Sequence, residues 1–162
     1  VNRLYSLNNF YVERGAECRC DSFCMGFFAN SKHGLAKAFE WSKHENEFIK
    51  RAGFVIMAAY GFADKAAGNE VFEQFFPVIE REANDDRIYV KKAVNWTLRN
   101  VGKRNVDLKK RAIVVAKRIL AINSKSAKWI AKNAINELEK PDVNILNYPR
   151  NIYKPALLRV NR

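Results

Sequence analysis

Three stretches of the sequence decide the fold: FIKRAGFVIM at 48–57, YVKKAVNWTL at 89–98 and IAKNAINELE at 130–139. They follow one another at an offset of 41 residues, and a second helix-length segment separates each from the next. At this offset the same residue types coincide, namely Lys50 with Lys91 and Lys132, and Ala52 with Ala93 and Ala134. A repeating unit of about 40 residues that contains two helices cannot bury its apolar face alone, so successive units must stack.

Helical spacing of apolar residues dominates the chain. Between Glu47 and Tyr60, and again between Asp107 and Ile122, apolar residues recur every three or four positions. Gly and Pro are scarce inside these segments, and no stretch alternates apolar and polar residues as a strand does. The sequence therefore predicts an all-α fold, a right-handed α-α superhelix of HEAT-like repeats comparable to ARM-repeat solenoids.

Five residues with side-chain oxygens precede the predicted helices and are expected to cap them: Asn46, Asn69, Asp86, Asn105 and Ser124. The chain divides into a divergent N-terminal segment (1–20), a HEAT-like repeat domain (21–139) and a basic C-terminal tail (140–162). Three prolines in the tail predict an extended or poorly ordered arm. Its Lys154, Arg159 and Arg162 are within reach of a polyanion, although a solvated chain end is the simpler interpretation.

The net charge of +12 is unevenly distributed. Residues 87–132 contain fourteen basic residues and a single acid, Asp107, whereas residues 64–86 contain seven acids and two bases. A solvated charged surface is the ordinary interpretation of a charge run, but near absence of acids over several helices favours nucleic acid. The predicted DNA contacts are Lys50, Lys91, Lys92, Arg99, Lys103, Arg104, Lys125, Lys128 and Lys132.

Other features of the sequence limit the class of protein. No window is apolar enough to span a membrane, and no signal-like apolar region opens the chain. We therefore expect a soluble cytoplasmic protein, associated with the nucleoid when bound to DNA. Cys18, Cys20 and Cys24 are odd in number and have no nearby His or fourth Cys, which argues against a disulfide framework and against zinc. We expect no metal and no cofactor.

The segment DRIYVKKAVNWTLRNVGKRN at 86–105 resembles a signature stretch of the DNA alkylation-repair family, the AlkD-like HEAT-repeat glycosylases. EWSKHENEFIKRAGFVIMAA precedes it and SKSAKWIAKNAINEL follows it, in the order that the family shows. The resemblance covers roughly residues 21–138. It implies a monomer that binds double-stranded DNA and hydrolyses the N-glycosidic bond of positively charged alkylated purines, such as 3-methyladenine and 7-methylguanine, without fully flipping the base.

The resemblance also implies roles for three residues. The catalytic Asp of the family falls on Asp21, its phosphate-holding Arg on Arg51, and its sugar-packing Trp on Trp96. Asp21 would stabilise the developing cationic sugar, Arg51 would bind phosphate, and Trp96 would offer an apolar, electron-rich face. Each has a structural alternative: Asp21 as cap of a helix beginning at Ser22, Arg51 as a solvated base, and Trp96 as part of the core.

The sequence departs from the family pattern at its start. Glu17 occupies the position of a second family Trp, Cys18 replaces the acidic residue after it, and additional N-terminal repeats are not evident. Trp41 and Trp129 are expected to pack rather than stack on a ligand, and His33 and His44 receive no catalytic role.

Three hypotheses follow for the function. The first is an alkylpurine DNA glycosylase. The second, supported by Glu17, is a non-catalytic DNA-binding protein that has lost the lesion cleft. The third is a protein-interaction solenoid, which basic residues scattered over both faces would favour.

Overall fold

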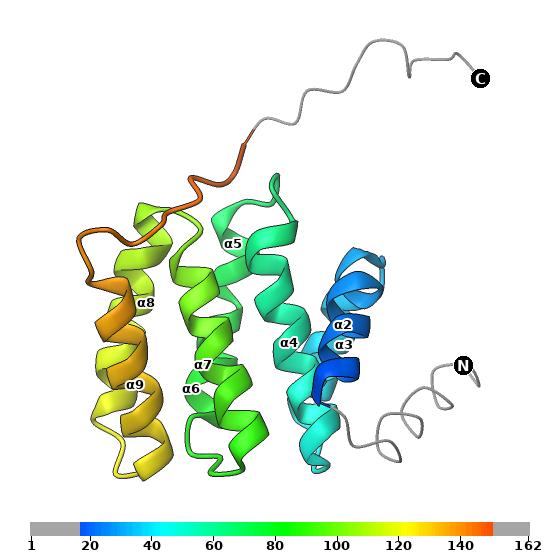
Figure 1. The fold of residues 1–162 in the computed structure, drawn as a ribbon, viewed down its shortest axis with the longest axis horizontal. Helices are drawn as coiled ribbons and strands as arrows, with labels where there is room; N and C mark the ends of the chain where they lie inside the picture. Colours follow the sequence, from blue (N-terminus) through cyan, green and yellow to red (C-terminus); the bar gives the residue numbers. More distant parts are fainter. Residues whose placement is uncertain (1–16, 151–162) are drawn as a thin grey trace.

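The structure, a computed structural model, describes the chain from residue 17 to residue 150, with side chains from Asp21 onward. Every regular element in this range is a helix, which confirms the all-α prediction (Figure 1). The elements are α2 (Glu17–Gly26), the 3-10 turn η1 (Phe28–Asn30), α3 (Gly34–Trp41), α4 (Glu47–Ala63), α5 (Asn69–Glu73), α6 (Phe75–Glu82), α7 (Ile88–Gly102), α8 (Val106–Leu120) and α9 (Lys125–Leu138).

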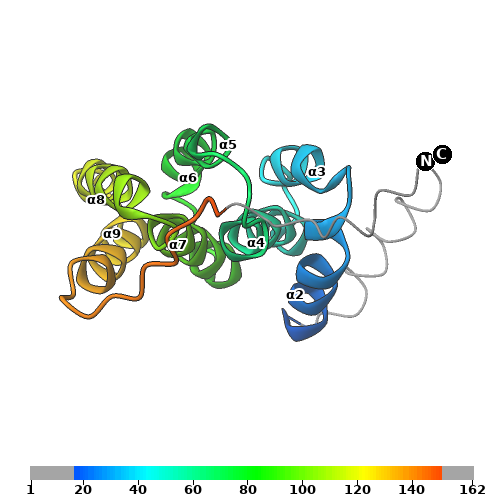
Figure 2. The ribbon, with the colours of Figure 1, turned by 90° about the horizontal axis from the view of Figure 1, so that it is seen from above.

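The helices form two layers. Figure 2 shows α2, α4, α7 and α9 following one another in one layer, which we call the inner layer, and α3, α5, α6 and α8 in the outer layer. The three repeated stretches of the sequence lie in α4, α7 and α9, so each occupies an inner helix that is preceded by its outer partner. In the same view α2 and α9 stand at the two ends of the inner layer, on one side of α4 and α7. We call this the concave side.

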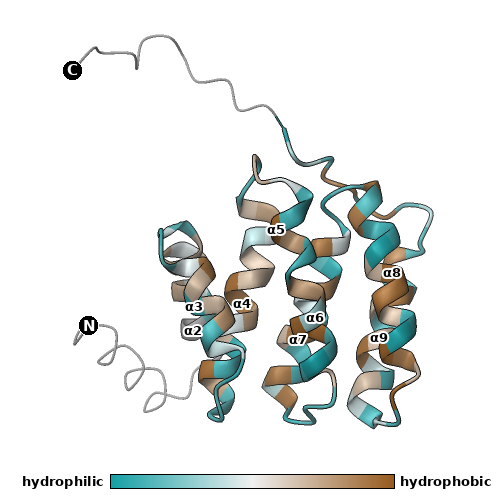
Figure 3. Cartoon of the chain, turned by 180° about the vertical axis from the view of Figure 1, so that it is seen from behind, coloured by the Kyte–Doolittle hydropathy of each residue, from teal (hydrophilic) through white to brown (hydrophobic). Residues whose placement is uncertain are grey.

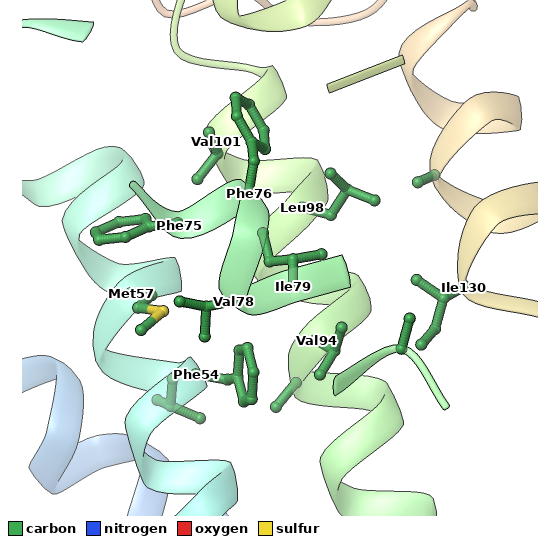
Figure 4. Packing of buried hydrophobic residues seen from close by; sticks show 14 of the residues in the cluster. Phe54, Met57, Phe75, Phe76, Val78, Ile79, Val94, Leu98, Val101 and Ile130 are labelled. Carbon is green, nitrogen blue, oxygen red and sulfur yellow. The ribbon is translucent and has the colours of Figure 1, made fainter. Parts of the chain in front are cut away.

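The core lies between the two layers. Phe75 and Ile79 of α6 are fully buried and lie between α4, which contributes Phe54, and α7, which contributes Leu98 (Figure 4). Each such side chain stabilises the fold by about 1.5–3 kcal/mol relative to an exposed one. Polar and apolar segments alternate along the outer helices and α9, as Figure 3 shows, whereas α4 is buried over most of its length.

The close approach of α3 to α4 depends on Gly53. A Cβ atom at this position would lie 2.6 Å from the Ser42 amide nitrogen and 2.8 Å from the Ala38 carbonyl oxygen. Both neighbours are backbone atoms and cannot move aside as a flexible side chain can. The two helices of the first complete pair therefore pack at a distance that only glycine permits.

Three of the five predicted caps are confirmed. The Asn46 side chain accepts from the Phe48 and Ile49 amides, Asn105 from Leu108, and Ser124 from Ala127. The other two predictions, Asn69 and Asp86, are wrong. The residue before α5 is Gly68 and the residue before α7 is Arg87, and neither provides a side-chain cap.

Residues 140–150 cross the ends of the helices as an irregular segment. The amide of Leu146 donates to the Lys103 carbonyl at 2.8 Å, that of Tyr148 to Arg104 at 2.8 Å, and that of Arg150 to Lys65 at 2.7 Å. The side chain of Tyr148 is buried. This part of the tail is therefore held by backbone hydrogen bonds, whereas Lys154, Arg159 and Arg162 lie outside the described residues.

The described residues contain neither a candidate membrane span nor a candidate metal cluster. No helix among them is long and apolar enough to cross a bilayer. They also contain no group of three or more His, Cys, Asp or Glu side chains that could hold a metal ion. Of the three cysteines in the predicted cluster, Cys24 is buried in the core, while the side chains of Cys18 and Cys20 lie outside the described range.

Candidate functional site

Asp21 and Arg51 are joined by a bidentate ion pair. Arg51 donates from Nε to Asp21 Oδ1 at 3.0 Å and from Nη2 to Oδ2 at 2.6 Å. The arginine side chain is only 4% exposed, whereas that of Asp21 is 21% exposed. Asp21 lies in the middle of α2, so the alternative that it caps a helix beginning at Ser22 is wrong. The paired carboxylate thus keeps contact with solvent, while the guanidinium does not.

The same guanidinium fastens α2 and α4 to the start of α7. Its Nη1 donates to the Tyr89 carbonyl oxygen at 2.9 Å. The amide of Tyr89 in turn donates to Glu47 Oε1 at 3.1 Å, so an acid of α4 provides the N-terminal capping that α7 lacks locally. The ring of Tyr89 lies 5.3 Å from that of Phe48. Three inner helices therefore meet at Asp21, Arg51 and Tyr89.

Trp96 lies on a solvent-facing stripe of α7 that begins at Tyr89. The stripe consists of residues spaced by three and four positions, none of them buried, namely Tyr89, Lys92, Trp96, Arg99 and Lys103. Seven residues separate Trp96 from Tyr89, which is about 10 Å along the helix axis. The indole is partly buried and packs against the core while keeping one part exposed. Trp96 is thus partly a core residue and partly accessible to a ligand.

Cations flank both aromatic residues of this stripe. Lys92 Nζ lies 5.9 Å from the centre of the Tyr89 ring, within the range of a cation–π contact. Arg99 and Lys103 both donate to the carboxylate of Glu137 in α9, Lys103 at 2.8 Å. Burial would raise the pKa of Glu137, but the hydrogen bonds and charges of Lys103 and Arg99 outweigh burial and lower it. Two cations facing one carboxylate leave a net positive charge at this point.

The prediction that Lys50 contacts DNA is wrong. Its side chain is 10% exposed and its ammonium pairs with Glu82 at 2.5 Å and Asp85 at 3.4 Å. Burial would raise the pKa of Asp85, but Arg87 and Lys50 together lower it, so the carboxylate stays charged. The repeat places Lys50, Lys91 and Lys132 at equivalent positions in sequence, yet the acids of α6 and the following loop neutralise only the first.

Arg104, another predicted DNA contact, is not accessible to DNA. It is fully buried, and its guanidinium donates to the carbonyl oxygens of Asp64 at 2.5 Å and Ala67 at 2.8 Å. The group lies 3.7 Å from the centre of the Phe72 ring. Burial lowers the pKa of this arginine. Its function is structural, because it holds the loop after α4 against α7.

The remaining predicted contacts lie on α7 and α9. Lys92, Lys125, Lys128 and Lys132 are exposed, and Lys91 is half-buried. Trp41 is buried as expected, whereas Trp129 is 42% exposed and only partly packed. Lys91 Nζ lies 5.6 Å from the centre of the Trp129 ring.

Basic residues also occur on the outer layer. Lys110, Arg111, Lys117 and Arg118 line the exposed face of α8, where Arg111 pairs with Glu73 and Arg118 with Glu80. A groove of about 420 Å³ lies between this face and α6, lined both by apolar residues such as Phe76 and Val114 and by charged ones such as Arg111. Charge alone therefore does not distinguish the two faces. The inner layer is distinguished by its aromatic residues and by the Asp21–Arg51 pair.

Three residues of the site were not predicted from the sequence. Glu47 and Tyr89 connect α4 to α7 across the repeat, and Glu137 restrains the two cations at the end of the stripe. The spacing of Tyr89, Trp96 and Lys103 by seven residues was a signal for one common helix face. Glu17, the departure from the family pattern, has a side chain outside the described range.

These features define the class of protein: a helical-repeat solenoid with an aromatic and cationic inner face beside a solvent-accessible carboxylate. The model of the DNA alkylation repair enzyme family matches residues 16–138 of the chain. The chain therefore belongs to this family and is a DNA repair protein for alkylation damage. Comparison with curated proteins and with solved structures gives no match.

Proposed function

We propose that the protein is a DNA glycosylase that excises positively charged alkylated purines, such as 3-methyladenine and 7-methylguanine, by hydrolysis of the N-glycosidic bond. Membership of the DNA alkylation repair enzyme family supports alkylated DNA as the substrate. The observation that carries the proposal is the Asp21 carboxylate, which Arg51 holds beside the start of the α7 stripe while leaving it partly exposed. Double-stranded DNA would lie along the concave side.

The reaction needs a negative charge beside the sugar. When the bond between C1′ and the base nitrogen breaks, its electron pair leaves with the base and neutralises the base's positive charge. Positive charge then develops on the sugar, where the carboxylate of Asp21 would stabilise it. Water adds to C1′ and releases a proton, so the products are the free base and an abasic site.

Arg51 has a different role from the one that the resemblance implies. Its guanidinium is buried and donates to Asp21 and to the Tyr89 carbonyl, so we assign it the positioning of Asp21 rather than the binding of phosphate. The bidentate pairing also fixes the orientation of the carboxylate. Phosphate contacts then fall to the cations of the stripe, Lys92, Arg99 and Lys103, and to the exposed lysines of α9.

Trp96 would pack its exposed indole surface against a deoxyribose at the lesion. Its partial burial fixes the ring, and its neighbours one turn away on the stripe, Lys92 and Arg99, are suited to the phosphates on either side of that sugar. A rigid aromatic surface between two cations would hold the backbone at the lesion without a pocket for an extruded base.

Release of free base from methylated duplex DNA tests the activity. We expect wild-type protein to release 7-methylguanine or 3-methyladenine, and Asp21→Asn to lose most of this rate while retaining duplex affinity. Absence of release by a folded, DNA-binding wild-type protein would reject the glycosylase proposal.

Salt-dependent binding tests the surface independently of activity. Lys92→Gln should weaken duplex binding and lower the salt slope by about one, because one phosphate contact is lost. Lys110→Gln on the outer layer is the matched control, since it removes the same charge from the opposite layer. Equal weakening by both variants would contradict the assignment of the concave side.

A non-catalytic DNA-binding protein is the second candidate. The observation in its favour is that both oxygens of Asp21 accept hydrogen bonds from Arg51, which offset the negative charge that catalysis requires. This candidate predicts the same salt-dependent binding with no base release from any methylated duplex.

A further inference from the structure

Trp129 is exposed, whereas most other apolar residues of its helix are buried. In α9, Ala127, Ile130, Ala131 and Ala134 are fully buried, whereas Trp129 is 42% exposed. A tryptophan in the core of a small protein stabilises the fold by burying a large apolar area. Because Trp129 is partly exposed, it contributes less of this stabilisation. The exposed part of the ring is available to a partner.

The surroundings of the ring are positively charged. Lys91 of α7 lies over the ring, with its ammonium 5.6 Å from the ring centre. Lys125, Lys128 and Lys132 are exposed neighbours on α9, at four and one positions before Trp129 and three positions after it. The stretch from Lys125 to Lys132 contains no acid. A partner that offers a flat apolar face together with negative charges fits both properties.

We propose that Trp129 and its lysines form a platform for an unpaired nucleobase of DNA adjoining the duplex. In a continuous duplex the faces of the bases are covered by their neighbours, so we expect the indole to stack on an unpaired base, at a single-stranded tail or gap. Base–aromatic stacking combined with a cationic track is the usual basis of single-strand binding. The inference rests on the proposed DNA function and adds a second contact, on the last inner helix, to the site at Asp21.

The affinities for a blunt duplex and for the same duplex with a short single-stranded tail test the platform. For the wild-type protein we expect the tail to tighten binding about tenfold, given the usual strength of stacking on one base. Trp129→Leu should lose this advantage and Trp129→Phe should retain most of it. The blunt duplex should bind all three proteins equally. A tail of abasic nucleotides, which keeps the phosphates, should give wild-type protein little advantage.

Other outcomes would overturn the proposal. An equal advantage of the tail for wild type and Trp129→Leu, or an undiminished advantage from the abasic tail, would show that the ring does not stack on a base. Loss of binding to a poly-glutamate peptide in Trp129→Leu, with the tail effect unchanged, would reassign the surface to an acidic protein partner. Failure of wild-type protein to bind any DNA would instead refute the proposed function.

Discussion

The site geometry makes its sharpest prediction for the stability of the variant in which methionine replaces Arg51. The variant loses two hydrogen bonds to Asp21 and one to the Tyr89 carbonyl, and it leaves the carboxylate without this partner. Removing one partner of a buried ion pair costs about 3–5 kcal/mol. Because the Asp21 side chain is 21% exposed and can recover some hydration, we expect a loss near the lower end, about 3 kcal/mol in the free energy of unfolding.

Urea denaturation followed by helical circular dichroism measures this loss, and a double-mutant cycle isolates the pair. Asp21→Asn should cost about 1–2 kcal/mol, because the amide can still accept one bond from Arg51. The double variant should be less destabilised than the sum of the two by about 1–2 kcal/mol. Additive losses, or a loss below about 1 kcal/mol for Arg51→Met, would refute the positioning role.

Three other predictions follow from buried or paired charges. Glu137→Gln should tighten duplex binding and steepen its salt dependence by about one charge, because Arg99 and Lys103 lose their shared partner. An unchanged slope in a salt titration would contradict this prediction. Arg104→Met should lower the free energy of unfolding by about 3 kcal/mol, measured in urea, without altering the salt slope of DNA binding. Asp85 and Glu137 have pKa values below the ordinary 3.8 and 4.5. The two carboxylates stabilise the fold when the pH lies above their ordinary pKa values, and this stabilisation is lost as the pH falls through their lowered pKa values in the folded protein. The urea midpoint should therefore decline in this acidic range. Asp85→Asn together with Glu137→Gln should flatten that decline.

The helical layers were predictable because the signal is periodic. An offset of 41 residues placed the three stretches in equivalent inner helices, and Asn46, Asn105 and Ser124 marked helix starts through local chemistry. The start of α7 was not predictable in this way. The Tyr89 amide in its first turn donates to Glu47, which lies more than forty residues earlier in the chain and leaves no local pattern.

The set of DNA contacts was only partly predictable, because sequence indicates charge but not pairing. Lys50 and Lys91 are equivalent in the repeat, yet acids of the following outer helix α6 and of the loop after it pair only with Lys50. Arg104 falls within the most basic region of the chain, but its guanidinium donates hydrogen bonds to backbone carbonyls of the loop after α4. Trp129 and Trp41 occupy similar helical patterns, and their difference in exposure depends on the neighbouring helices.

The central claim is that Asp21, oriented by Arg51, stabilises the sugar cation during base release. Single-turnover release of 7-methylguanine from methylated duplex DNA, at protein concentrations that saturate the DNA, tests it most directly. The account predicts measurable release by the wild-type protein and a loss of about a hundredfold or more in Asp21→Asn, the usual cost of removing one electrostatic catalyst. Equal rates for the two proteins at saturation would contradict it.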